Sequence, residues 1–240
     1  ILSLGVVALG GFTWPASGTA LELLGGVGAS MTPAQEMRQG TTQFQQGAFG
    51  QAAAHWMNAA RGFEETGQVK EQSQALINVA HALQQEGQIR RAQGTLQSAL
   101  KLSEQAGERG LTATILAQLG NTFQLLGKDE PATEHLTKAL TLAREVNRPV
   151  LVAGILNDLG NALTARRQFA EAIDVYAESR ALAAESKQEA LAATAQINGA
   201  MALLQNQQLG EAHRHLDQAW TQVRSLGDGQ AKTAGLLNIG

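Results

Sequence analysis

Two histidines lie close enough in this sequence to suggest a metal site. His213 and His215 form a His-x-His pair in the segment EAHRHLD. A zinc ion needs several ligands that converge on one point. Side chains two positions apart on a helix point about 200° away from each other, so this pair cannot share an ion. We interpret both histidines as exposed polar residues of a helix.

The other residues that could take part in chemistry are isolated. His55 and His135 each precede a large apolar residue, and we expect them at the part-buried edge of a helix. The glycine-rich stretch LGGVG, Leu24 to Gly28, lacks the Lys-Ser/Thr pair of a phosphate-binding loop, so we interpret it as a flexible joint. The absence of cysteine excludes disulfides, cysteine-bound zinc and thiol catalysis. The sequence therefore predicts no catalytic residues, no metal site, no cofactor and no enzymatic activity.

The composition narrows the class of partner. The chain has 240 residues, 44% of them hydrophobic, and a formal net charge of −3. No basic stripe is visible, and this argues against a nucleic-acid partner. Alanine, leucine and glutamine are abundant and aromatic residues make up only 4%, so strong helix formers dominate. These features favour a helical protein without a nucleic-acid partner.

The strongest signal is an internal repeat with a period of 40 residues. Small residues recur at this interval, and alanine recurs twelve positions later without exception. A large apolar residue follows four positions after each alanine. The three registers are Gly40, Ala80, Gly120, Gly160, Ala200 and Gly240; Ala52, Ala92, Ala132, Ala172 and Ala212; and Trp56, Leu96, Leu136, Tyr176 and Leu216.

The registers predict a helix–turn–helix hairpin in each copy. Small residues let two helices approach closely, and the large apolar residues fill the space between them. Glycine accepts the left-handed conformation that often ends a helix, so it is expected at the two turns of each copy. The expected caps are Gly47, Gly87 and Gly127 for the first helix, and Gly67, Gly107, Asn147 and Gly227 for the second. Lys187 breaks this pattern, so its turn should be less sharply specified.

This pattern resembles the tetratricopeptide repeat family. The residues that carry the resemblance are NDLGNAL, from Asn157 to Leu163, on the first helix and AEAIDVYAESRAL, from Ala170 to Leu182, on the second. The family's small–large–small signature falls on Ala172, Tyr176 and Ser179. The resemblance implies an all-α fold, an α-solenoid in which helix–turn–helix hairpins stack into a right-handed superhelix.

The period departs from the usual 34 residues of this family. Forty-residue versions look like those of kinesin light chains, spindle-orientation adaptors and bacterial proteins in which the repeats precede a caspase-like protease domain of the CHAT type. The array is expected over residues 31–240, as five full repeats and the first half-helix of a sixth. Because the sequence stops within that repeat, we expect the natural protein to continue past Gly240.

The resemblance also implies a concave groove lined by the first helices. Asparagine side chains in such a groove often bond the backbone of an extended peptide, since an amide carries both donor and acceptor. Asn121 and Asn161 are therefore the leading contact residues, although they could instead bond only a neighbouring helix. The full set of predicted groove residues is Asn121, Asn161, Asn157, His81, Gln84, Gln124, Thr41, Phe44, Met201 and Leu204.

Two further features of the first helices bear on the groove. A polar ladder two positions before each small residue comprises Asn78, Gln118, Asp158, Asn198 and Asn238, and we interpret it as structural, tying one repeat to the adjacent turn. The groove positions used by chaperone-tail readers of this family carry no Lys or Arg here. The expected ligand is therefore a neutral or mildly apolar protein segment.

The N-terminal segment, residues 1–30, differs from the rest. The run from Ile1 to Trp14 is apolar and too short to span a bilayer comfortably. It resembles the core of a secretory signal with a cleavage point after Ala20, although a basic leading segment and an initial Met are missing. The alternative is a hydrophobic cap or membrane anchor. A signal predicts a periplasmic, secreted or envelope-associated protein; otherwise the chain is cytoplasmic.

Three functions are compatible with this sequence. The first is a non-catalytic scaffold that binds a peptide or partner protein in the groove. The second is the regulatory arm of a larger enzyme, such as a CHAT-type protease, continuing beyond Gly240. The third is an envelope-associated assembly factor tethered by its N-terminus.

Overall fold

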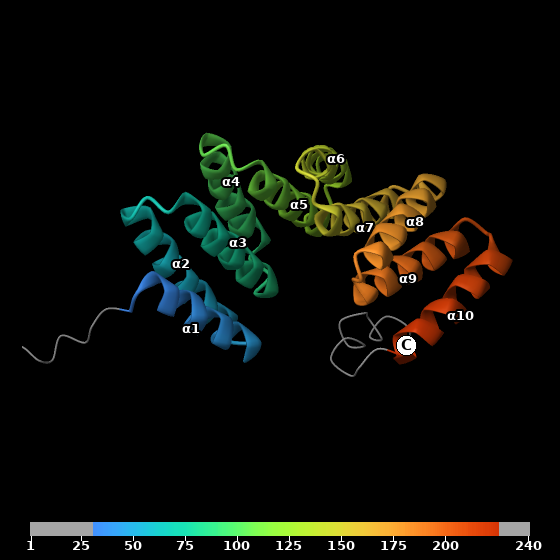
Figure 1. Ribbon diagram of the computed structural model, residues 1–240, viewed down its shortest axis with the longest axis horizontal. Coiled ribbons are helices and arrows are strands. Elements are labelled where there is room, and N and C mark those ends of the chain that lie inside the picture. The colour runs from blue at the N-terminus through green and yellow to red at the C-terminus, as the bar shows by residue number, and fades with distance from the viewer. Residues whose placement is uncertain (1–30, 226–240) are drawn as a thin grey trace, which may run out of the picture. The chain divides into compact units, whose positions relative to one another are not determined.

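The computed structural model describes residues 31–225, and these residues form ten α-helices without a strand (Figure 1). The chain divides into two units, Ile1–Met31 and Thr32–Gly240, and the helices belong to the second. The predictions for residues 1–30 and for the partial sixth repeat, which includes Gly227 and Asn238, lie outside the described residues.

The helices form five helix–turn–helix hairpins, as the repeat predicts. The first helix has 13 residues and each of the others has 17, and three residues connect each helix to the next. One helix and one turn thus account for 20 residues, half of the period. The hairpins are α1 (Pro33–Gln45) with α2 (Phe49–Glu65), α3 (Val69–Gln85) with α4 (Ile89–Gln105), α5 (Arg109–Leu125) with α6 (Asp129–Glu145), α7 (Pro149–Ala165) with α8 (Phe169–Glu185), and α9 (Glu189–Gln205) with α10 (Leu209–Ser225).

Each turn contains one residue with positive φ. In the N-terminal half these residues are glycines, which confirms the predicted caps there. Later turns place Asn147, Arg167, Lys187 and Gln207 in the same conformation, with φ between 52° and 62°. The backbone N–H groups of Lys187 and Gln188 donate to the carbonyls of Ala184 and Ala183, at 3.0 and 2.8 Å. The Lys187 turn is therefore as well defined as the glycine turns, because its hydrogen bonds repeat those found throughout the array. The positive-φ residues are Gly47, Gly67, Gly87, Gly107, Gly127, Asn147, Arg167, Lys187 and Gln207.

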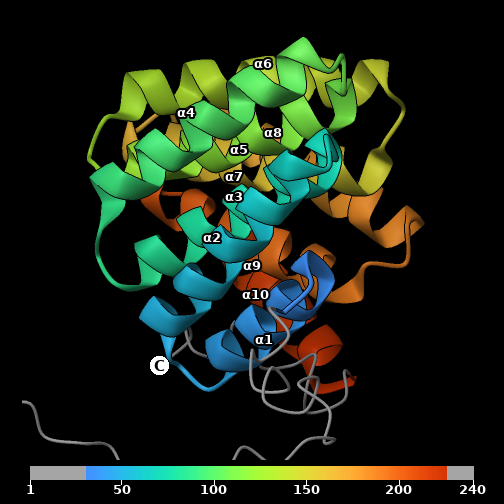
Figure 2. The same cartoon turned by 90° about the vertical axis from the view of Figure 1, so that its left-hand side faces the viewer.

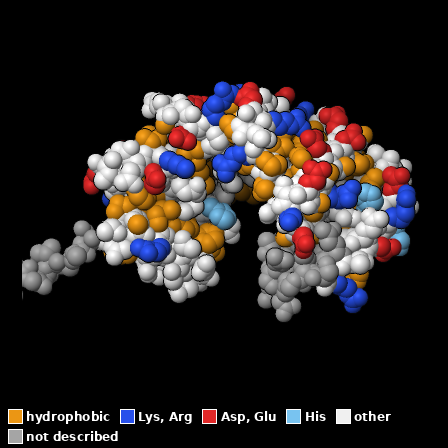
Figure 3. Space-filling model, in the orientation of Figure 1, with side chains coloured by type: hydrophobic (Ala, Val, Ile, Leu, Met, Phe, Trp, Pro, Cys, Tyr) orange, Lys and Arg blue, Asp and Glu red, His pale blue; other side chains and the backbone are white. Residues whose placement is uncertain are grey.

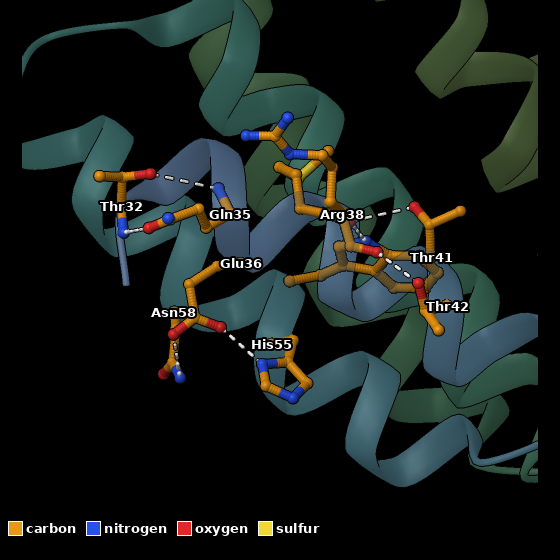
Figure 4. Close-up of polar contacts among 10 residues, drawn as sticks. Thr32, Gln35, Glu36, Arg38, Thr41, Thr42, His55 and Asn58 are labelled. Carbon is orange, nitrogen blue, oxygen red and sulfur yellow. Dashed lines mark hydrogen bonds and ion pairs between the residues drawn. The ribbon is translucent and has the colours of Figure 1, made fainter. Parts of the chain in front are cut away.

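The described array begins with a side-chain cap on α1 (Figure 4). The Thr32 hydroxyl accepts a hydrogen bond from the Gln35 backbone N–H, while the Gln35 side chain accepts one from the Thr32 N–H. This reciprocal pair satisfies two donors that the helix itself leaves free. Glu36 then joins α1 to α2 through His55, whose Nδ1 lies 2.6 Å from the carboxylate, so His55 occupies the expected part-buried edge.

The small and large registers meet inside each hairpin. The five alanines of the second register are completely buried, and Trp56, Leu96, Leu136 and Tyr176 are buried with them. A Cβ atom added to Gly40 would lie 2.5 Å from the Trp56 ring, and one added to Gly160 would lie 2.5 Å from the Tyr176 ring. Glycine is needed here because the ring occupies the space of a side chain. Leu216 is only part-buried, unlike its counterparts.

The hairpins stack side by side, and the stack is curved. In Figures 1 and 2, α4 and α6 lie on the outer side of α5. Along the inner side of the curve in Figure 1 lie the first helices, α1, α3, α5, α7 and α9. The structure is thus an α-solenoid, and the helices predicted to line a concave surface do line it.

Candidate functional site

A chain of polar side chains runs along the inner face of the first helices. Asn121 on α5 donates through Nδ2 to Asp158 Oδ2 on α7, at 2.9 Å. Asn198 on α9 donates to the amide oxygens of Asn157 and Asn161 on α7, at 3.0 and 3.4 Å. These bonds join the first helices of successive hairpins at two ladder positions, Asp158 and Asn198, instead of reaching the adjacent turn that was expected. The partners of Asp158 and Asn198 lie on the preceding first helix. Asn78 accepts a bond from Gln74 of its own helix.

Two further bonds extend this network. The Tyr176 hydroxyl of α8 donates to Asn161 Oδ1 at 2.7 Å. Burial raises the pKa of Tyr176 to about 12, so the hydroxyl keeps its proton and remains a donor at neutral pH. Towards the other end, Gln84 on α3 donates through Nε2 to the Thr122 hydroxyl of α5, at 2.8 Å. The network therefore connects α3 and α5, and separately α5, α7, α8 and α9.

Asp158 is the acidic member of this network. It is part-buried, and burial raises the pKa of its carboxyl group from 3.8 to about 6. Hydrogen bonds from Asn121 and Asn157 oppose this rise, because they stabilise the charged form. Asp158 is thus ionised at neutral pH and protonated at moderately acidic pH.

The ends of the inner face are more apolar. Phe44 is part-buried, and its ring centroid lies 4.9 Å from that of His81, an exposed residue on α3. Phe44 also packs against Phe49 and Trp56. At the opposite end, Met201 is 45% exposed and Leu204 is part-buried. The inner face thus changes from an aromatic cluster through amides to aliphatic side chains.

The predicted groove residues differ in their exposure to solvent and in the hydrogen bonds that they already make. Asn157 is buried, whereas Asn161, Thr41, His81 and Met201 are exposed and the other predicted residues are part-buried. The Thr41 hydroxyl donates to the Met37 carbonyl of its own helix at 3.0 Å (Figure 4). The network brings Asn121, Asn157 and Asn161 together. A contact of any of these residues with a peptide remains a prediction.

A cavity opens between α5 and α7 beside this network. Its volume is about 590 Å³, within the range of ligand pockets. Asp158 and Gln118 supply polar groups, Val150 and Leu151 supply apolar surface, and Gly154 leaves part of α7 without a side chain. The lining residues are Thr114, Ala117, Gln118, Asn147, Arg148, Pro149, Val150, Leu151, Gly154, Ile155 and Asp158.

A larger cavity, of about 770 Å³, lies between α2 and α4 over Val79 of α3. Its walls combine small residues, such as Ala53, Ala54 and Gly94, with larger apolar and charged ones. The polar groups at its rim bond one another, since Gln88 donates to Glu86 and Arg91 donates to Gln88. The cavity beside Asp158 is the better candidate site, because Asp158 has no ion-pair partner among the described residues and Asn121, which donates to it, has an unsatisfied acceptor.

The surface of the array has an uneven charge distribution. In Figure 3, acidic and basic side chains are interspersed along the outer side, and the left wall of the hollow shows mainly apolar, uncharged and histidine side chains. The described residues contain no group of three or more His, Asp or Glu side chains that could bind a metal ion. His213 is exposed, as expected, whereas His215 is part-buried. None of the described helices is long and apolar enough to cross a membrane.

Comparison with known families agrees with the geometry. A family model described as tetratricopeptide repeat matches residues 71–145, and a second model of the same description matches residues 152–186. The chain is a tetratricopeptide repeat protein. Among curated protein sequences, none matches this chain.

Solved structures share the tetratricopeptide solenoid at low sequence identity. BtubC (BKLC) from P. vanneervenii is 20% identical, with a TM-score of 0.70 over 79% of this chain and 78% of that one. The nearly identical TPR-like repeats of a Podospora anserina protein assigned as a kinesin light chain are 17% identical, with a TM-score of 0.65 over 80% and 96%. A Rap protein complexed with competence and sporulation factor is also 17% identical, with a TM-score of 0.70 over 80% of this chain and 54% of its own.

Sequence reasoning missed several features of this tetratricopeptide array. It placed Tyr176 in the core, where its ring does lie, but not its hydroxyl in the groove network. The repeat pattern places Asp158 in a structural ladder, but it does not indicate that this carboxylate lacks an ion-pair partner among the described residues. The available signal was that Asp158 is the one carboxylate in its register, whose other described members are Arg38 and the amides Asn78, Gln118 and Asn198.

Proposed function

We propose that this protein is a non-catalytic interaction scaffold that holds a peptide or an extended segment of a partner protein along the inner face of its first helices. The observation that carries the proposal is the amide network of α5, α7 and α9 beside an open cavity of about 590 Å³. Amide groups bond peptide backbone without regard to sequence, and the neighbouring apolar surface adds affinity.

The exposed apolar residues of this face support the same proposal. Leu125 at the end of α5 is 60% exposed, Val150 at the start of α7 is 45% exposed and Met201 on α9 is 45% exposed. A bound segment that covers these side chains removes apolar area from water, worth about 25 cal/mol per Å² before the costs of association. The Rap protein complexed with competence and sporulation factor supports the idea that such a solenoid can hold a signalling factor.

The test uses peptides selected from a displayed random library on the whole protein. Leu125→Glu places a charge on the inner face at a position exposed enough to leave the fold intact. Leu209→Glu is the matched control, since Leu209 is 66% exposed at the start of α10, a second helix. We expect Leu125→Glu to weaken selected peptides about tenfold and Leu209→Glu to leave affinity nearly unchanged.

A second pair of variants tests the amides themselves. The double variant Asn121→Ala, Asn161→Ala should bind the selected peptides more weakly. Its circular dichroism should still show a folded array. Asn58→Ala on α2 is the control, because this exposed amide lies on a second helix. Peptides that bind all variants with equal affinity would place the binding surface elsewhere.

The alternative proposal is that the array is the regulatory arm of a larger enzyme. It is supported by the 40-residue period, which resembles that of repeats preceding CHAT-type protease domains. Sequencing the complete coding region decides between them: a Cys and His dyad downstream of Gly240 favours the enzyme, and its absence leaves the scaffold. Mass spectrometry of the native chain's N-terminus tests the proposed export signal.

A further inference from the structure

Asp158 is an unusual residue to find within this network. The corresponding positions of the second, third and fifth repeats carry amides, Asn78, Gln118 and Asn198, which can make the same ladder bonds without a charge, and the first repeat carries Arg38. A part-buried carboxylate loses hydration, and buried charges normally have a charged partner. Among residues 31–225, Asp158 takes part in no ion pair.

A second acceptor lies next to this carboxylate. The Asn121 amide donates its N–H to Asp158, and its own oxygen Oδ1 is buried without a hydrogen-bond partner among the described residues. Unpaired buried acceptors are rare because each one loses its bonds to water. The two side chains thus offer one carboxylate and one free amide oxygen, and both groups can only accept hydrogen bonds.

The cavity between α5 and α7 gives a ligand access to Asp158, to which Asn121 is hydrogen-bonded. Asp158 lines it together with Gln118, and the position of Gly154 is open, since nothing lies within 4 Å of an added Cβ. Val150, which is 45% exposed, and the part-buried Leu151 can cover an aliphatic chain. A long side chain with an apolar stem and a hydrogen-bond-donating, positively charged end matches this arrangement.

We propose that Asp158 and Asn121 form a cation-binding subsite of the groove, which holds a lysine or arginine side chain of the bound protein segment. This inference rests on the proposed peptide-binding function and adds a specificity to it. The ligand ammonium or guanidinium group donates to Asp158 and to Asn121 Oδ1, so it supplies both the missing charge and the missing hydrogen bond.

Among the described residues that line the cavity, Asp158 is the only acid. The groups that face it are uncharged at neutral pH: Gln118 and Asn121 from α5, Asn157 from its own helix, Tyr176 from α8 and Asn198 from α9. Arg148 lines the cavity ten positions earlier in the chain, about 15 Å away along α7. Burial raises the pKa of Asp158 to about 6. Acidification below this value should therefore remove the charge of Asp158 and weaken binding of the cation.

The first test uses small probes and does not depend on peptide binding. Nα-acetyl-lysinamide is titrated into the whole protein while the Asn121 side-chain amide signals are followed by NMR, with Nα-acetyl-glutaminamide as the neutral probe. We expect saturable shifts with the lysine probe alone, weaker at pH 5 than at pH 7.5. Asp158→Asn should weaken binding about tenfold, and the exposed-residue control Asp174→Asn should not. Lysine-probe binding that survives Asp158→Asn, or is absent from the unmodified protein, overturns the subsite.

The second test separates this inference from the proposed function. Peptides selected by the unmodified protein should carry Lys or Arg at one fixed position, and those selected by Asp158→Asn should lose this preference. Selected peptides without a basic position would overturn the subsite and leave the groove standing. If no peptide is selected while the lysine probe still shifts Asn121, the peptide-binding function is wrong and the cation subsite stands.

Discussion

At the scale of single residues, the same side chains hold the array together and shape its inner face. Asn161 accepts bonds from Tyr176 and Asn198, yet it remains exposed on the groove side. Only one end of the Asn121 amide has a hydrogen-bond partner among the described residues. Its N–H group donates to Asp158, whereas its oxygen accepts no hydrogen bond. An amide in a solenoid groove can therefore support the fold with one end and bind a ligand with the other.

The Tyr176 hydroxyl should contribute measurably to stability. Tyr176→Phe keeps the ring against Gly160 and removes the bond to Asn161, so we expect a loss of about 1 kcal/mol in the free energy of unfolding. Urea denaturation measures it. Tyr176→Phe combined with Asn161→Ala should cost less than the sum of the two, and strict additivity would contradict the bond.

Asp158 should make stability depend on pH in a specific direction. Its folded-state pKa of about 6 lies above the usual 3.8, so between these values the folded chain binds the proton more tightly than the unfolded chain. Asp158 therefore costs stability as pH rises from about 4 to 7. We expect Asp158→Asn to stabilise the protein by about 1–2 kcal/mol at neutral pH and by little near pH 4. Denaturant unfolding of both proteins at the two pH values measures this, and a gain that is equal at both would contradict it.

At the scale of elements, the turns share one geometry despite different residues. The positive φ of Arg167, Lys187 and Gln207 costs each side chain conformational energy that glycine avoids. The bonds from the turn to the end of the preceding helix outweigh this cost. The second half of the array therefore carries strain at its turns that the first half lacks.

This difference predicts opposite effects of glycine substitutions. Lys187→Gly should raise the free energy of unfolding by about 0.5–1 kcal/mol, and Gly127→Ala should lower it by a similar amount, since an added Cβ at Gly127 meets no neighbour and only φ matters. Gly94→Ala is the control, because Gly94 is helical with open space around it and should gain stability from alanine. If Gly127→Ala stabilised the protein as Gly94→Ala does, a side chain at positive φ would carry no energetic cost in these turns, contrary to our expectation.

At the scale of the whole array, each hairpin contacts mainly its neighbours, so stability is close to a sum of hairpin and interface contributions. Leu136 is completely buried in the central hairpin, in contact with the position of Gly120. A defect there should spread to adjacent hairpins before it reaches the ends.

Hydrogen exchange can follow this spread. Leu136→Ala should cost about 2–5 kcal/mol and lower amide protection most in α5 and α6, then in α4 and α7, and least in α1 and α2. Exchange measured by mass spectrometry gives protection for each helix. A uniform loss from α1 to α10 would indicate that the array unfolds as one cooperative unit.

The sequence by itself determined the repeat, the hairpins and the helices that line the inner face. It could do so because small, large and turn residues recur at fixed spacing, and each acts on its own helix or on the next one. The register of alanines from Ala52 to Ala212, all completely buried, is the clearest case.

Only the tertiary structure decided how the polar side chains pair across repeats. Whether Asn121 meets Asp158, or Tyr176 reaches Asn161, depends on how successive first helices are spaced and rotated, and no local pattern encodes that. The unpaired Asn121 oxygen and the cavity beside Asp158 arise in the same way, from the packing of α5 against α7, because hydrogen-bond geometry changes over distances smaller than a side chain.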